Sequence, residues 1–135
     1  MTRILLVEAE PALARRITWI LETEGFETTV AASTDDLAGL TPGGFDAVIV
    51  DCDHDTPKKR WLIERIRETA PAAAIVDVHS AAMTQVPHAE RSGADVYIHK
   101  PFDAATLLET LADLINRNAE MHTPARDPRT SEDDG

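Results

Sequence analysis

The stretch AVIVD (residues 47–51) is a short, continuous apolar run that ends on an aspartate. A run of this kind is typical of a strand buried on both faces of a parallel sheet. Two related stretches are ILLVEAE (residues 4–10) and DVYIHKP (residues 95–101). Carboxylates and one ammonium therefore follow strands directly, and this favours a site that handles phosphate and a metal ion.

Strand-like and helix-like segments alternate along the whole chain. Strands are expected at residues 4–7, 27–32, 46–50, 73–78 and 95–98. Helices are expected after Pro11 and ending at Gly25, over 34–40, after Pro57, weakly over 81–92, and after Asp103. This alternation predicts a doubly wound α/β domain with a five-stranded parallel sheet. Ligands of such sheets bind beyond the carboxyl ends of the strands.

Apolar periodicity stops near residue 118, which divides the chain into one domain and a tail. Residues 1–117 have the length of an ordinary domain of roughly 100–150 residues. Residues 118–135 carry five acidic residues against two arginines and hardly any bulky apolar side chain, so we expect a disordered acidic tail.

Composition excludes several classes of function. The chain has 24 acidic and 13 basic residues and a net charge of −11, which argues against binding to nucleic acid. It lacks the roughly 20-residue apolar stretch that spans a membrane. The N-terminus shows no secretory signal, and the lone Cys52 cannot form an intrachain disulfide, so a cytoplasmic location is expected.

The chain resembles the receiver domain of bacterial two-component response regulators over residues 3–117. The resemblance rests on ILLVEAEPALARR (4–16), FDAVIVD (45–51), SGADVYIHKPF (92–102) and LLETLADLI (107–115). It implies a flavodoxin-like receiver fold with strand order 2-1-3-4-5. It also implies that the chain is a signalling module and not an enzyme. Such a module takes phosphate from a histidine kinase or a phosphotransfer protein.

The resemblance carries over to individual residues. Asp51 matches the phosphoacceptor, and Lys100 matches the lysine that contacts the phosphoryl group. Tyr97 matches the aromatic residue that rotates on activation, and the switch hydroxyl falls at His79 or Ser80. For Mg²⁺ the resemblance implies three ligands, namely Glu8, Asp51 and the backbone carbonyl of Asp53.

The chain departs from the family pattern where the metal is held. The second residue of the acidic pair, a direct metal ligand in the family, is Ala9. Mg²⁺ commonly takes one or two carboxylates together with waters and phosphate. Loss of one carboxylate predicts weak Mg²⁺ binding and impaired phosphorylation, although Glu10 offers a carboxylate nearby that could reach the ion through a water.

Two other functions compete with the phosphorylated receiver. A pseudo-receiver would bind a protein partner without accepting phosphate. A phosphohydrolase of the haloacid-dehalogenase type would use Asp51-Cys52-Asp53, but its motif needs threonine or valine where this chain has Asp55. No output domain follows residue 117, so signalling is expected through protein contact. In the family, the face of the fourth helix, fifth strand and fifth helix serves for docking or homodimerisation.

Several polar and aromatic residues have simpler interpretations. Asp77 lies inside a predicted strand, where burial is costly without a partner, so exposure at a sheet edge or a local register shift is expected. The basic run Lys58-Lys59-Arg60 is interpreted as a solvated helix face, and Trp19 and Trp61 as packing residues. A transition-metal cluster of Cys52, His54, His79 and His99 fits no common zinc spacing.

Overall fold

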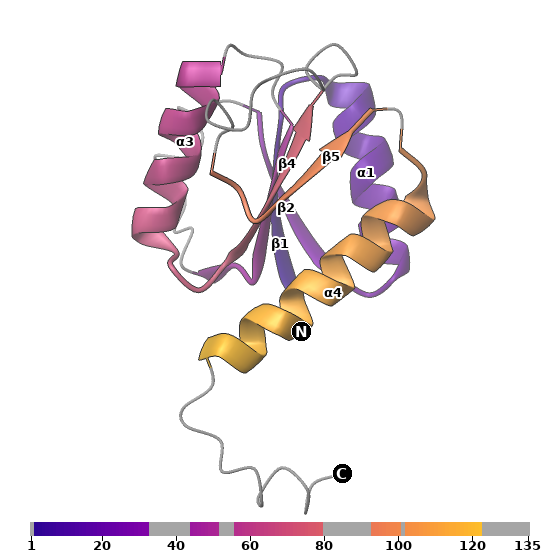
Figure 1. Cartoon of the computed structure of the whole chain (residues 1–135). Coiled ribbons are helices and arrows are strands. Elements are labelled where there is room, and N and C mark those ends of the chain that lie inside the picture. The colour runs from indigo at the N-terminus through magenta and orange to yellow at the C-terminus, as the bar shows by residue number, and fades with distance from the viewer. Residues whose placement is uncertain (1, 33–43, 52–55, 80–92, 101, 123–135) are drawn as a thin grey trace, which may run out of the picture.

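Five parallel strands form one sheet with helices on both of its faces (Figure 1). The strands are β1 (Arg3–Glu8), β2 (Glu27–Ala31), β3 (Ala47–Asp51), β4 (Ala74–His79) and β5 (Val96–His99). The helices are α1 (Pro11–Thr23), α3 (Thr56–Thr69) and α4 (Ala104–His122). The spatial order is β2-β1-β3-β4-β5, and every neighbouring pair is parallel. The predicted fold class and strand order are confirmed.

This computed structural model describes residues 2–32, 44–51, 56–79, 93–100 and 102–122. The helices expected over 34–40 and 81–92 fall outside these residues, as does residue 123 onward of the expected tail. The third strand begins and ends one residue later than predicted, at Ala47 and Asp51, so Asp51 is itself the last residue of the strand.

The core lies in two layers, one on each face of the sheet, because successive strand residues point to opposite faces. Ile4, Leu6 and Ile49 pack on one face, beneath α1 and α4. Leu5, Val48 and Val50 pack on the other, beneath α3. Figure 1 shows α1 and α4 on one side of the sheet and α3 on the other. β1 is therefore apolar from Ile4 to Val7 and β3 from Ala47 to Val50, and each strand ends on an acidic residue.

Both ends of α1 follow from local chemistry. The Glu10 carboxylate caps the helix by accepting hydrogen bonds from the backbone N–H groups of Ala12 (3.2 Å) and Leu13 (3.0 Å). Pro11 occupies the first turn, where a missing N–H costs nothing. The helix ends before Gly25, whose φ of 91° is the left-handed conformation that the sequence predicts for it.

The last helix is longer than predicted. The Asp103 carboxylate accepts a hydrogen bond from the Thr106 N–H at 2.7 Å, which starts α4 where expected. Residues 118–122 are helical, so the boundary placed at residue 117 cuts through the helix. Ala119, Glu120 and Met121 are good helix formers and favour the extension, which follows an exposed ion pair of 2.7 Å between Arg117 and Asp113.

The two tryptophans are not core residues. Trp19 on α1 is 70% exposed and Trp61 on α3 is 52% exposed, so their interpretation as packing residues is wrong. The Arg65 guanidinium lies 5.6 Å from the centroid of the Trp61 ring, a cation–π contact on the solvent side of α3.

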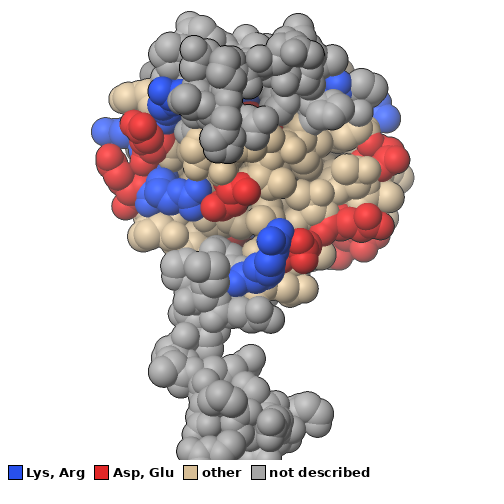
Figure 2. All heavy atoms as spheres, in the orientation of Figure 1, with Lys and Arg blue, Asp and Glu red and all other residues tan. Residues whose placement is uncertain are grey.

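Charged side chains of both signs share the surface. On the face shown in Figure 2, Lys and Arg lie scattered among Asp and Glu rather than in one basic stripe. Within the described part of the chain, every helix is too short or too polar to cross a membrane.

Removal of one buried leucine tests the core beneath α4. Leu111 is fully buried, so Leu111→Ala should lower the free energy of unfolding by about 2–5 kcal/mol. Urea denaturation measures the change. Glu109→Ala, an exposed site on the same helix, is the control and should stay within about 0.5 kcal/mol of the parent. Equal stability of the two variants would contradict the position of α4.

Candidate functional site

Strand register brings the predicted site residues together at the carboxyl edge of the sheet. In the pairing of β1 with β3, Glu8 lies opposite Asp51. Lys100 follows β5 and reaches past β4, so that its Nζ lies 2.9 Å from Oδ1 of Asp51. Three residues far apart in the sequence thus meet because parallel strands end at the same edge.

The two carboxyl groups are buried, which sets their chemistry. The Asp51 side chain is 1% exposed and the Lys100 side chain is 26% exposed. Oε2 of Glu8 and Oδ2 of Asp51 are buried, and no N–H group of the described residues donates a hydrogen bond to either of them. The Lys100 ammonium balances one negative charge. The oxygens that remain are the kind of ligand that a hard divalent cation prefers.

The pKa of the Glu8 carboxyl lies well above its ordinary value. Burial is the largest of the causes that together raise the pKa of its carboxyl from 4.5 to about 8, and a hydrogen bond to the neighbouring Asp51 carboxyl and the negative charge of Asp51 act in the same direction. The backbone N–H of Glu10, which donates to Oε1 of Glu8 at 3.0 Å, lowers this pKa in opposition, as does Lys100. A shared proton therefore relieves repulsion between two buried carboxylates.

The expected second acidic residue is absent, and its neighbour does not replace it. Ala9 is exposed directly after β1. Both oxygens of the Glu10 carboxylate are used to cap α1, with bonds to the N–H groups of Ala12 and Leu13. The contact of Glu10 with a metal ion through a water stays a prediction.

The predicted switch residues are only partly described. Ser80 and Asp53 lie outside the described residues. His79 is the last residue of β4, in register with His99, and the residue opposite Asp51 is Val78. Tyr97 is half-buried, and its hydroxyl accepts a hydrogen bond from the Gly93 N–H at 2.9 Å.

The sequence did not predict a buried ion pair that lies beside this edge. Lys59 on α3 and Asp77 on β4 are each 4% exposed, and Lys59 Nζ lies 2.5 Å from Oδ1 of Asp77. β4 lies between β3 and β5, so the expected exposure of Asp77 at a sheet edge is wrong. Lys59 is not part of a solvated face either. The sequence feature that could have indicated the ion pair is the acidic residue Asp77 inside a buried strand, because such a residue requires a cationic partner.

Comparison with known proteins agrees with this geometry. The family model of the response regulator receiver domain matches residues 4–112. The sensory transduction protein RegX3 of Mycolicibacterium smegmatis is 30% identical over 122 residues, which cover 89% of this chain and 53% of that protein. The chemotaxis protein CheY-3 of Vibrio cholerae is 31% identical over 122 residues, which cover 85% of this chain and 92% of that protein.

A solved structure has the same fold. The crystal structure of a response regulator receiver domain protein from Clostridium thermocellum superposes with a TM-score of 0.73 at 25% identity, over 90% of this chain and 99% of that one. The chain spans about half the length of several curated relatives, 49% of the transcriptional regulatory protein TrcR of Mycobacterium tuberculosis among them.

The raised pKa of Glu8 predicts a pH dependence of stability. Between pH 4.5 and about 8 the folded chain keeps a proton on Glu8 that the unfolded chain releases, so Glu8 weakens folding as the pH rises through this window. In metal-free buffer, Glu8→Gln should lose less thermal stability between about pH 5 and 8 than the parent does. Glu22→Gln on the exposed face of α1 is the control. Parallel melting curves of parent and Glu8→Gln would contradict the shift.

Proposed function

The chain belongs to the family of response regulator receiver domains of two-component signalling, and we propose that its Asp51 accepts a phosphoryl group from a histidine kinase or a phosphotransfer protein. The observation that carries this proposal is the contact of 2.9 Å between Lys100 Nζ and Oδ1 of Asp51. A buried acceptor carboxylate paired with an ammonium is suited to receive a phosphoryl group and to hold the negative charge that arrives with it.

The transfer itself follows from the positions of these groups. A carboxylate oxygen of Asp51 attacks phosphorus, the new O–P bond forms, and the P–N bond of the donor phosphohistidine breaks. The released imidazole nitrogen takes up a proton. Lys100, which lies beside Asp51 and is partly exposed, is positioned to pair with a phosphoryl oxygen.

The described residues fit a magnesium ion in part. Oε2 of Glu8 and Oδ2 of Asp51 are two buried oxygens to which no N–H group of the described residues donates, and Asp53 is the proposed third ligand through its carbonyl. Bound Mg²⁺ would neutralise charge that develops on the transferring phosphoryl group. Coordination by Glu8 requires its carboxylate form, so binding releases a proton and strengthens as the pH rises. Ala9 supplies no ligand, and this weakens the site.

The signal is proposed to leave by protein contact. The face that receiver domains use for docking and dimerisation consists of the fourth helix, the fifth strand and the fifth helix of the family. In this chain the fifth strand is β5 and the last helix is α4, and both lie within the described residues. The expected fourth helix, over residues 81–92, lies outside them. His79 or Ser80 is proposed as the switch position, and Tyr97 as the aromatic residue that responds. The hydroxyl of Tyr97 would then have to release the Gly93 N–H.

One observation favours a second function. Ala9 and the commitment of Glu10 to capping α1 leave the metal site short of one carboxylate. A pseudo-receiver that binds its partner without phosphate is therefore the alternative. A phosphohydrolase finds less support, because Asp51 ends the third strand and Asp55 stands where that motif needs threonine or valine.

Exposure to a small phosphodonor separates these functions. With acetyl phosphate and excess Mg²⁺, intact mass should show one added phosphoryl group on the parent protein and none on Asp51→Asn, because Asp51 is the acceptor. Asp46→Asn, which changes an exposed carboxylate at the opposite edge of the sheet, is the control and should be phosphorylated like the parent. A phosphorylated Asp51→Asn would refute the assignment of the acceptor. An unmodified parent would favour the pseudo-receiver, and steady release of phosphate the hydrolase.

Restoration of the missing carboxylate tests the weakness of the metal site. Ala9→Asp should bind Mg²⁺ at least about tenfold more tightly than the parent, because it adds an anionic oxygen ligand at the strand ends. Calorimetric titration at pH 8 measures both affinities. Ala112→Asp adds the same charge at an exposed position of α4 and controls for net charge. Equal affinity of Ala9→Asp and Ala112→Asp would contradict the role given to position 9.

A further inference from the structure

Lys59 makes two buried contacts at the end of β4. Its Nζ lies 2.5 Å from Oδ1 of Asp77 and donates a hydrogen bond of 2.9 Å to the carbonyl oxygen of Val78. Its neighbours on α3, Leu62 and Ile63, are core residues. Replacement of a buried ion pair by apolar side chains of similar volume is often neutral or stabilising, because both charges of the pair lose their hydration when they are buried. The pair therefore calls for a role other than stability.

The place of the pair indicates that role. Val78, whose carbonyl Lys59 binds, is the residue of β4 that lies in register with Asp51. Adjacent strands of a sheet are roughly 4.8 Å apart. Lys59 belongs to the first turns of α3, which is the next described element after Asp51. One ammonium thus joins the start of α3 to the strand end beside the acceptor.

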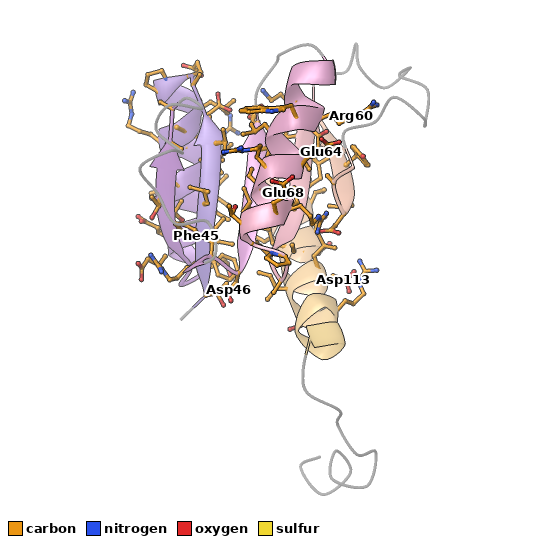
Figure 3. The ribbon with its side chains drawn as sticks, turned by 90° about the vertical axis from the view of Figure 1, so that its left-hand side faces the viewer. Phe45, Asp46, Arg60, Glu64, Glu68 and Asp113 are labelled. Carbon is orange, nitrogen blue, oxygen red and sulfur yellow. The ribbon has the colours of Figure 1, made fainter. Side chains whose placement is uncertain are left out.

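A second ion pair fixes the other end of α3 and offers a comparison. The Arg67 guanidinium contacts both carboxylate oxygens of Asp95, at 3.3 and 3.2 Å. Asp95 in turn accepts a hydrogen bond from the Ile75 N–H at 2.7 Å. This pair is partly exposed and ties α3 to β4 and to the start of β5, away from Asp51. Figure 3 shows Arg60, Glu64 and Glu68 along the outer side of the same helix.

We propose that Lys59 is a positioning residue for phosphoryl transfer to Asp51. The proposal rests on the function proposed for Asp51 and adds a residue to it. By holding Asp77 and the Val78 carbonyl, the Lys59 ammonium fixes the carboxyl end of β4 against the acceptor strand. Asp51 and Lys100 come from the strands on the two sides of β4, so the position of β4 sets the geometry between them.

An apolar replacement of the whole pair tests the proposal without leaving an unpaired buried charge. Lys59→Met/Asp77→Val should fold with a melting temperature equal to or above that of the parent. Its maximal rate of phosphorylation by acetyl phosphate at saturating Mg²⁺ should nevertheless fall about tenfold, because misplaced reacting groups lose rate steeply. The concentration of acetyl phosphate at half-maximal rate should stay unchanged. Arg67→Met, which breaks the comparison pair, should phosphorylate at the rate of the parent.

Amide hydrogen exchange gives a readout that does not depend on phosphate. In the double variant, exchange at residues 76–79 should be at least about tenfold faster than in the parent and in Arg67→Met, because the end of β4 opens more often. A folded double variant that phosphorylates at the parental rate would overturn the proposal. If the parent takes no phosphate, the function proposed for Asp51 fails, and unchanged exchange at 76–79 would then overturn the anchoring by Lys59 as well.

Discussion

Two carboxyl groups buried side by side at the end of a parallel sheet are the constraint on which the site depends. Glu8 and Asp51 lie in register on neighbouring central strands, and both are buried. Two negative charges in such a place repel each other and lose their hydration, so they require a proton, an ammonium or a metal ion. The raised pKa of Glu8 and the contact of Lys100 with Asp51 are two responses to the same requirement.

The alanine at position 9 changes the balance of charge between these buried groups. A third carboxylate beside Glu8 and Asp51 would add negative charge that only a divalent cation could offset well. With alanine there, the described charges of the site come close to balance through Lys100 and a proton on Glu8.

The fold could be predicted from the sequence, and so could the residues that meet at the carboxyl edge of the sheet. Continuous apolar runs predicted buried parallel strands, and strand ends predicted the meeting of Glu8, Asp51 and Lys100. Residues whose roles depend on a partner from another element could not be predicted in the same way. Asp77 indicated a buried charge, but only the packing of α3 on β4 shows that Lys59 pairs with it.

Helix ends and exposed aromatic side chains are a second kind of feature that the sequence did not predict. The place of Glu10 after β1 suggested a carboxylate that could reach a metal ion through a water, and the sequence did not show that this carboxylate caps α1. Trp19 and Trp61 looked like core residues because large aromatic side chains are usually buried, and both are exposed. The end of α4 lies beyond the apolar stripe that ends at Ile115, where Ala119, Glu120 and Met121 have good helix propensity.

The protonation of Glu8 tests this electrostatic arrangement most directly. Carboxyl ¹³C NMR of the labelled protein, recorded over a pH titration with and without Mg²⁺, follows this group by itself. Without metal, Glu8 should titrate well above the ordinary range of glutamate, near the value of about 8 that its burial beside Asp51 imposes, and added Mg²⁺ should lower that pKa. A Glu8 carboxyl that titrates in the ordinary range near 4.5, with no response to Mg²⁺, would contradict a buried carboxyl pair at the centre of the site.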